Sequence, residues 1–236
     1  MDYGRIIDDA LAYTKEGVWE KPNRWMKLIL AIVILGIPLS GYILRIYRGA
    51  TPAPEVDRWG SLFIDGLKLY VIALIYSIPV LAIWLLEYGR MLAAAFSGGF
   101  SHPGAVFMAG TPPNIGLLIL MYVIQIVIGV ILPVAAIRFA RTGTISEAFR
   151  FGEITGYIGK IGWVRYILAL IIVTILVSIP IFILMFAFIV AGILIFKSIL
   201  GTIIAMTVVM LIIMPFISLF QARYMTCVYD SAIPAA

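Results

Sequence analysis

The stretch YILALIIVTILVSIPIFILMFAFIVAGILIF, residues 166–196, contains 31 consecutive residues without a charged side chain. About 20 helical residues are enough to cross the ~30 Å of hydrocarbon in a bilayer. Within lipid, each backbone N–H and C=O group must find its hydrogen-bond partner inside the protein, a condition that a helix meets by itself. We therefore predict a membrane-spanning helix here, long enough to tilt, to kink or to extend beyond the bilayer.

The chain contains four further uncharged apolar stretches, and its overall composition is also that of a membrane protein. Hydrophobic residues make up 63% of the 236 residues and charged residues only 12%, about half the charged share of a soluble protein. The sequence predicts an all-α integral membrane bundle of about five transmembrane or re-entrant helices, with amphipathic interfacial helices between them. The other four stretches are residues 28–44, 69–86, 115–137 and 198–222.

Each of the five stretches contains one proline. A proline removes a backbone hydrogen bond and bends a helix. The prolines are either tolerated without a function, as in many membrane helices, or serve as hinges of the kind that line transporter cavities. They are Pro38, Pro79, Pro133, Pro180 and Pro215.

Residues 1–25 form a separate N-terminal segment. Ile6, Ile7, Ala10 and Leu11 recur at helical spacing, opposite acidic and basic side chains. This pattern is typical of an amphipathic helix that lies on a membrane surface. We expect residues 26–230 to form a single transmembrane helical domain.

A second amphipathic segment carries four glycines at steps of four, three and three: Gly152, Gly156, Gly159 and Gly162. On a helix they would form one bare stripe, which lets another backbone approach closely, as small residues do between membrane helices. The alternative is a flexible segment, because glycine has little helix propensity.

A weak internal repeat is visible in the two halves of the chain, with a chance similarity as the alternative. Arg45 and Arg48 follow one proline-containing stretch, and Arg138 and Arg141 follow another. Each pair precedes an aromatic–glycine pair by a similar distance, which suggests a parallel duplication of residues 26–90 and 115–196. Arginines three apart share a helix face, and their planar forks suit phosphate. We expect these four residues to contact an anionic lipid or another phosphate-bearing ligand; plain positive-inside anchoring is the alternative.

The distribution of the 17 Lys and Arg residues bears on orientation, because positive side chains gather on the cytoplasmic side. Five crossings with the N-terminus outside leave a small cytoplasmic excess. If residues 28–44 instead enter and return on one side, 15 of the 17 lie on the same side, leaving only Arg90 and Lys197 opposite. Both topologies place the C-terminus in the cytoplasm.

Several short motifs appear in a fixed order: GYILR at 41–45, WGSLFIDGLK at 59–68, IYSIP at 75–79, ARTG at 140–143 and AFRFGE at 148–153. Together they resemble the DUF4013 family of prokaryotic, largely archaeal, multi-pass membrane proteins. The resemblance covers most of the chain and implies a polytopic helical fold in the cell membrane. It implies no activity for any residue.

The sequence argues against catalysis. None of the five stretches contains Asp, Glu, Lys, Arg or His, which proton-coupled transport normally requires, and the chain has one histidine (His102) and one cysteine (Cys227). We expect no enzyme activity, no cofactor, no metal site and no nucleic-acid partner. The expected function is assembly, as a subunit, scaffold or lipid-organising element with anionic lipids or a second copy as partners. A passive channel or a transporter is the alternative.

Overall fold

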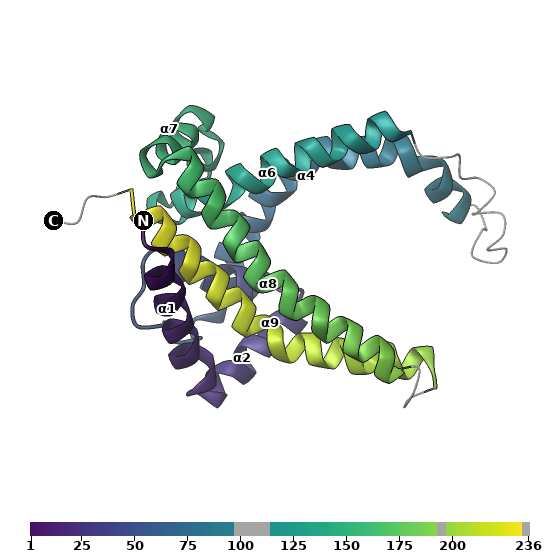
Figure 1. Ribbon diagram of the computed structural model, residues 1–236, viewed down its shortest axis with the longest axis horizontal. Coiled ribbons are helices and arrows are strands. Elements are labelled where there is room, and N and C mark those ends of the chain that lie inside the picture. The colour runs from purple at the N-terminus through teal and green to yellow at the C-terminus, as the bar shows by residue number, and fades with distance from the viewer. Residues whose placement is uncertain (97–113, 193–196, 233–236) are drawn as a thin grey trace. The chain divides into compact units, whose positions relative to one another are not determined.

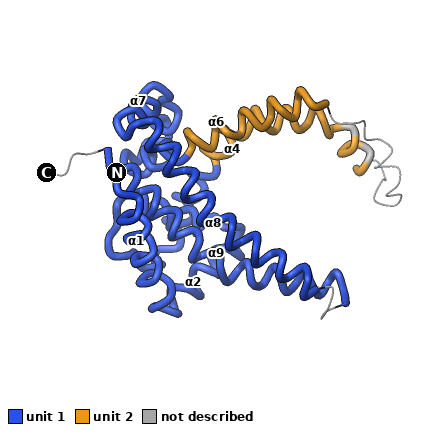
Figure 2. The backbone as a smooth tube through the Cα atoms, in the orientation of Figure 1, with its two compact units in different colours: residues 1–70, 133–236 blue, residues 71–132 orange. Residues whose placement is uncertain are grey.

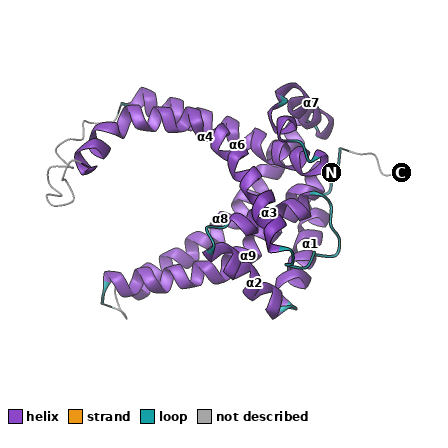
Figure 3. Cartoon of the chain, turned by 180° about the vertical axis from the view of Figure 1, so that it is seen from behind, coloured by secondary structure: helices purple, strands orange, loops and turns teal. Residues whose placement is uncertain are grey.

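The computed structural model describes residues 1–96, 114–192 and 197–232, and within them the secondary structure is helical, without strands (Figure 3). Within these described residues, four helices are long and apolar enough to cross a membrane. They are α4 (Trp59–Ala94), α6 (Ile115–Thr142), α8 (Trp163–Ala191) and α9 (Ile199–Asp230), shown in Figure 1. The predicted all-α membrane bundle is confirmed.

The chain forms two compact units, which Figure 2 colours separately. Unit 2 is Val71–Leu132, which comprises most of α4 and of α6. Unit 1 is Met1–Tyr70 together with Pro133–Ala236. It contains the remaining elements and the ends of α4 and α6. The predicted N-terminal segment 1–25 thus belongs to the larger unit, and the division of the chain into 1–25 and 26–230 stays a prediction.

The first apolar stretch does not form a single helix. It divides into α2 (Pro22–Val33) and α3 (Ile37–Tyr47). Between them, Leu35 and Gly36 adopt positive φ angles of 57° and 68°, which a continuing right-handed helix cannot contain. Pro38 therefore lies in the first turn of α3 and not in a helix interior. In the part of the chain that the structure describes, the expected five or so spanning or re-entrant helices are four long helices and one broken segment.

Both outer ends of the broken segment meet the same residue. Arg24, in the first turn of α2, donates from Nη2 to the carboxylate of Glu55. Arg45, in the last turn of α3, donates from Nη1 to the Glu55 backbone carbonyl at 3.0 Å. The helices have 12 and 11 residues, or about 18 and 16 Å at 1.5 Å per residue. Because neither helix is long enough to span a bilayer and their outer ends meet, the segment has the geometry of a helical hairpin; its re-entry into the membrane stays a prediction.

Side chains from other helices bond the backbone around this hairpin. The hydroxyl of Tyr70 donates to the carbonyl of Leu35 at 2.9 Å, at the break between α2 and α3. The indole of Trp25 donates to the carbonyl of Ile212 on α9 at 2.9 Å. Pro215 has no amide to donate to the carbonyl of Leu211, the residue before Ile212. The Tyr70 bond partners a backbone group at the break in the hairpin, and the Trp25 bond connects the hairpin to α9 beside its proline.

Two glycines bring α3 and α4 into backbone contact. A Cβ atom added to Gly41 would lie 1.9 Å from the carbonyl oxygen of Leu62, and one added to Gly66 would lie 1.8 Å from that of Ile37. Neither distance allows a side chain. Small residues permit such close helix crossings in membrane proteins, so these two positions fix the hairpin against the start of α4.

The remaining elements are short. α1 (Tyr3–Thr14) and the π-helical turn η1 (Lys15–Trp19) pack on α9 through Ala10, Tyr13, Thr14 and Val18. The turn η3 (Ile145–Phe149) leads into α7 (Phe151–Ile161), whose buried face contains three isoleucines. The helical pattern read in the N-terminal residues is confirmed for Tyr3–Thr14. Its apolar face covers α9 in addition to any membrane contact.

We predict that Gly41→Ala and Gly66→Ala each destabilise the protein by more than about 2 kcal/mol, because the new methyl group overlaps a backbone carbonyl that cannot move aside. The matched controls are Gly152→Ala and Gly156→Ala, where a Cβ meets nothing within 4 Å and alanine raises helix propensity. Melting temperatures of the purified protein in mild detergent would measure the difference. Equal melting temperatures for all four variants would contradict the backbone contact.

Candidate functional site

One set of charged residues in unit 1 joins the ends of helices that are distant in sequence. Each of its carboxylates lies opposite an arginine on another element or connector, and we call the set the arginine–carboxylate network. Its ion pairs are Asp9–Arg223, Arg24–Glu55, Arg45–Asp57, Arg48–Asp65, Arg138–Glu147 and Arg141–Asp230.

The second arginine of each predicted pair caps the helix that carries the other pair. Arg48, at the end of α3, donates from Nε to the carbonyl of Ala140 on α6 at 3.3 Å. Arg141, at the end of α6, donates from Nε to the carbonyl of Tyr47 on α3 at 2.6 Å. The two acceptors are the residues that immediately precede Arg141 and Arg48. Because carbonyls in the last turn of a helix lack intrahelical partners, each arginine satisfies one at the end of the opposite helix.

The same two arginines extend the connection to further helices. Nη2 of Arg48 lies 2.8 Å from a carboxylate oxygen of Asp65 on α4. Nη2 of Arg141 lies 2.8 and 2.9 Å from the two carboxylate oxygens of Asp230 at the end of α9. Four helix ends, those of α3, α4, α6 and α9, therefore meet through two guanidinium groups. We call this the reciprocal arginine clasp.

The first arginine of each pair folds the following connector back onto its own helix. Arg45 donates to the carboxylate of Asp57 at 2.5 Å and to its carbonyl at 3.0 Å. Arg138 donates to the carboxylate of Glu147 in η3 at 2.6 Å. The two Arg-x-x-Arg pairs thus have the same arrangement. In each pair, the first arginine binds the following connector and the second arginine binds the helix that carries the other pair. This shared geometry supports the predicted duplication, which stays a prediction.

The expected contact with an anionic lipid competes with the ion pairs inside the chain. It concerns Arg45, Arg48, Arg138 and Arg141. Every one of the four guanidinium groups has a carboxylate partner within its own chain. Their side chains are between 15 and 41% exposed, so a phosphate would compete with Asp or Glu for the same donors. Contact with an anionic lipid stays a prediction, and the structure gives the four residues an internal role.

Two pairs of the network were missed by sequence reasoning. Arg24 is buried, with 3% of its surface exposed, and its hydrogen bond holds the pKa of the Glu55 carboxyl below its usual range. Asp9 on α1 accepts from Nε of Arg223 on α9 at 2.6 Å, and this bond lowers the pKa of the Asp9 carboxyl. Arg223 also lies 5.0 Å from the ring centroid of Tyr13, a cation–π distance. Only the fold brings these partners together, across 31 and 214 residues.

The glycines of α7 lie on an open face. A Cβ added to Gly152 or Gly156 meets nothing within 4 Å, and one added to Gly159 lies 3.9 Å from the indole nitrogen of Trp163. Gly162 has a different position from the other three, because it ends α7 with a φ angle of 95°. Gly152 and Gly156 face away from the described residues of the chain, and the use of the stripe as a packing surface stays a prediction.

Among the described residues, no group of three or more His, Cys, Asp and Glu side chains could hold a metal ion. His102 lies outside the described residues. The thiol of Cys227 lies 3.2 Å from a carboxylate oxygen of Asp9, within the network.

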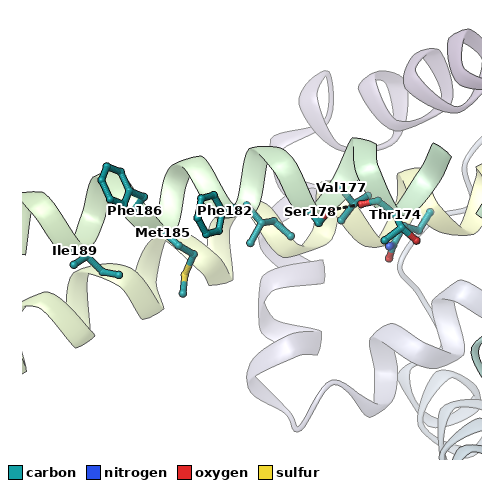
Figure 4. A pocket seen from close by; sticks show the side chains of 9 residues that line it. Thr174, Val177, Ser178, Phe182, Met185, Phe186 and Ile189 are labelled. Carbon is teal, nitrogen blue, oxygen red and sulfur yellow. Dashed lines mark hydrogen bonds between the residues drawn. The ribbon is translucent and has the colours of Figure 1, made fainter. Parts of the chain in front are cut away.

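An open groove of about 560 Å³ runs along α8 (Figure 4). Its lining is apolar except for Thr174, Ser178 and Gln221. The two hydroxyls donate to the carbonyls of Leu170 and Thr174, one turn earlier on α8, at 2.7 and 2.6 Å. This is the back-bonding common for such side chains in membrane helices. Gln221 on α9 is exposed and escaped the sequence analysis.

Four apolar spans, a broken hairpin and a charged network at the helix ends define a multi-pass helical membrane protein. The model of the family described as "Protein of unknown function (DUF4013)" matches residues 26–189. The chain belongs to this family, as the motifs led us to expect. No curated protein and no solved structure matches it.

We predict that Arg141→Lys lowers the stability of the purified protein by about 1–2 kcal/mol, because one ammonium group cannot serve the Tyr47 carbonyl and the Asp230 carboxylate with the geometry of a guanidinium fork. Arg58→Lys is the control, since Arg58 is 82% exposed and lies 4.0 Å from its carboxylate. Thermal melting in detergent would compare the two variants. Equal losses would show that Arg141 acts only as a surface charge.

Proposed function

We propose that this protein is a non-catalytic, multi-pass membrane protein that works by assembly, as a subunit, scaffold or lipid-organising element. The proposal rests on one observation: the charged residues of the network form ion pairs that join helix ends. The network pairs join different segments of unit 1 and spread over several helix ends. A catalytic constellation would instead direct its acid, base and nucleophile toward one reacting centre. The network supports a structural platform.

The face of α7 at Gly152 and Gly156 is not covered by the described residues of the chain. Ile154, Ile158 and Ile161 attach this helix to the rest of unit 1, whereas Gly152 and Gly156 are exposed and have open space before them. Glycine within a helix is less stable than alanine by about 1 kcal/mol. The described chain makes no contact that offsets this loss. A helix of a second copy, or of another membrane protein, would gain close backbone contact there.

For orientation we propose that the network faces the cytoplasm in the cell membrane, with the C-terminus on the same side. The hairpin geometry of residues 22–47 favours the topology in which this segment returns, which gives the larger excess of positive residues on one side. A cysteine at Arg150 should then resist an impermeant thiol reagent added to intact cells, while one at Asn114 reacts. The opposite labelling pattern would overturn the orientation.

A passive channel or transporter is the second candidate. The α8 groove favours it, because Thr174, Ser178 and Gln221 bring polar atoms to an otherwise apolar surface. Prolines lie inside all four long helices, where they weaken the backbone ladder and permit bending.

The test compares assembly with flux. Tagged protein is extracted in mild detergent, and its particle mass and bound partners are measured for Gly156→Leu and for the control Gly129→Leu, whose position on α6 is also open. Assembly predicts an oligomer or a stoichiometric partner that Gly156→Leu removes and Gly129→Leu retains. A monomeric, partner-free protein that passes small solutes across purified vesicles would overturn the proposal in favour of the channel.

A further inference from the structure

A second cavity, of about 430 Å³, lies between α1, α8 and α9 in unit 1. Its lining side chains are all apolar. From α1 come Ile7 and Leu11; from α8 and α9 come Leu176, Val177, Pro180, Ile181, Leu184, Ile213, Phe216, Ile217 and Phe220. Leu11 and Leu176 remain 44 and 40% exposed, so the cavity is an open groove. We call it the α1 groove.

The contacts of α1 fix the roof of this groove. Tyr3, Ile7 and Leu11 are spaced by four and share one face of the helix. The hydroxyl of Tyr3 donates to the carbonyl of Arg165 in the first turn of α8 at 3.0 Å. Asp9 ties the helix to Arg223 of α9. α1 is therefore held across both spanning helices, with Ile7 and Leu11 turned into the gap.

A proline shapes the floor. Pro180 has no amide to donate to the carbonyl of Leu176, one turn earlier, and its ring prevents close approach of that turn. Both residues line the groove. The groove thus coincides with the point where the backbone ladder of α8 is interrupted.

One cation, Arg165, lies at the end of the groove that is marked by the Tyr3–Arg165 bond. Arg165 is exposed and forms no ion pair within residues 1–96, 114–192 and 197–232, unlike the arginines of the network. Arg5, two positions after Tyr3, lies on the opposite face of α1, and Asp2 accepts its backbone N–H as the cap of that helix. Arg165 is the cation on α8 itself.

The spacing along α8 matches an amphiphile. Arg165 and Leu176 are 11 residues apart, which is three helical turns, so they lie on the same face. Their separation is about 16 Å at 1.5 Å per residue, close to the ~15 Å of hydrocarbon in one leaflet. A phosphate at Arg165 would place the attached acyl chain alongside Leu176 and Pro180.

We propose that the α1 groove binds one acyl chain of an anionic membrane phospholipid, whose phosphate lies at Arg165. The wholly apolar lining suits a hydrocarbon chain, and the unpaired guanidinium of Arg165 complements a negative headgroup. The site goes beyond the proposed function, because a scaffold and a channel could each carry it. It is also distinct from Arg45, Arg48, Arg138 and Arg141.

The experiment measures lipid retention by native mass spectrometry on protein delipidated in detergent and then given equal phosphatidylglycerol and phosphatidylcholine. Arg165→Gln should lower retention of phosphatidylglycerol about fivefold and leave phosphatidylcholine unchanged. Its control, Lys197→Gln, removes a cation at the other end of the α8–α9 pair and should change neither. Leu176→Trp should fill the groove and reduce retention of both lipids, while Ile175→Trp, at an exposed neighbour that does not line the groove, should not.

Ile213→Trp fills the same groove from α9 and should repeat the effect of Leu176→Trp, which separates loss of the site from misfolding of α8. Equal phosphatidylglycerol retention in Arg165→Gln and Lys197→Gln would overturn the headgroup assignment. Equal retention in Leu176→Trp and Ile175→Trp would overturn the groove as the chain site. A wild-type dimer that Leu176→Trp and Ile213→Trp dissociate would assign the groove to a second copy and also overturn the proposal.

Discussion

The reciprocal arginine clasp is the interaction on which the rest of unit 1 depends. A helix ends with carbonyls that have no partner within the helix, and α3 and α6 end beside one another. Arg48 and Arg141 each cap the opposite helix and then reach a carboxylate on a third, Asp65 or Asp230. Charge-assisted hydrogen bonds of this kind are roughly twice as strong as neutral ones. Two side chains therefore determine where four helices converge.

The clasp also explains how a broken apolar segment can be part of the fold. A hairpin of two short helices leaves backbone groups near its turn without helical partners, and lipid offers none. The end of α3 is held by the clasp, and its start is held where the carbonyl of Ile37 meets Gly66 of α4. Tyr70 then bonds the carbonyl of Leu35 at the break. The hairpin is sheltered because its two ends are fixed in the same charged network.

The sequence predicts the elements that depend on local composition. The four long helices could be predicted because uncharged, mainly apolar stretches of about 18 residues or more have few alternatives to a membrane-spanning helix. The break in the first stretch lies at Leu35 and Gly36, and the re-entrant topology of that segment, which rests on charge counting, stays a prediction. The Arg-x-x-Arg pairs were recognised as motifs in the sequence, and they include Arg48 and Arg141, which form the clasp.

The partners of those arginines could not be predicted, because they depend on contacts between residues far apart in sequence. Arg141 and Asp230 are separated by 89 residues, and Arg223 and Asp9 by 214. The glycines show the same limit. A regular spacing drew attention to the stripe on α7, whereas the backbone contact within the chain is made by Gly41 and Gly66, single glycines whose role depends on how α3 crosses α4.

The most direct test of the clasp is a double-mutant cycle between Arg48 and Arg141, with each replaced by lysine alone and together, and unfolding followed in detergent. Residues that share partners in one network usually couple by 0.5–3 kcal/mol, whereas independent sites add to within about 0.3–0.5 kcal/mol. If the two arginines cap each other's helices, the first substitution by lysine already releases the helix ends. The double variant should then lose about 1 kcal/mol less stability than the sum of the losses of the two single variants. Effects that add within about 0.3 kcal/mol would show that the two arginines act independently and would contradict the clasp.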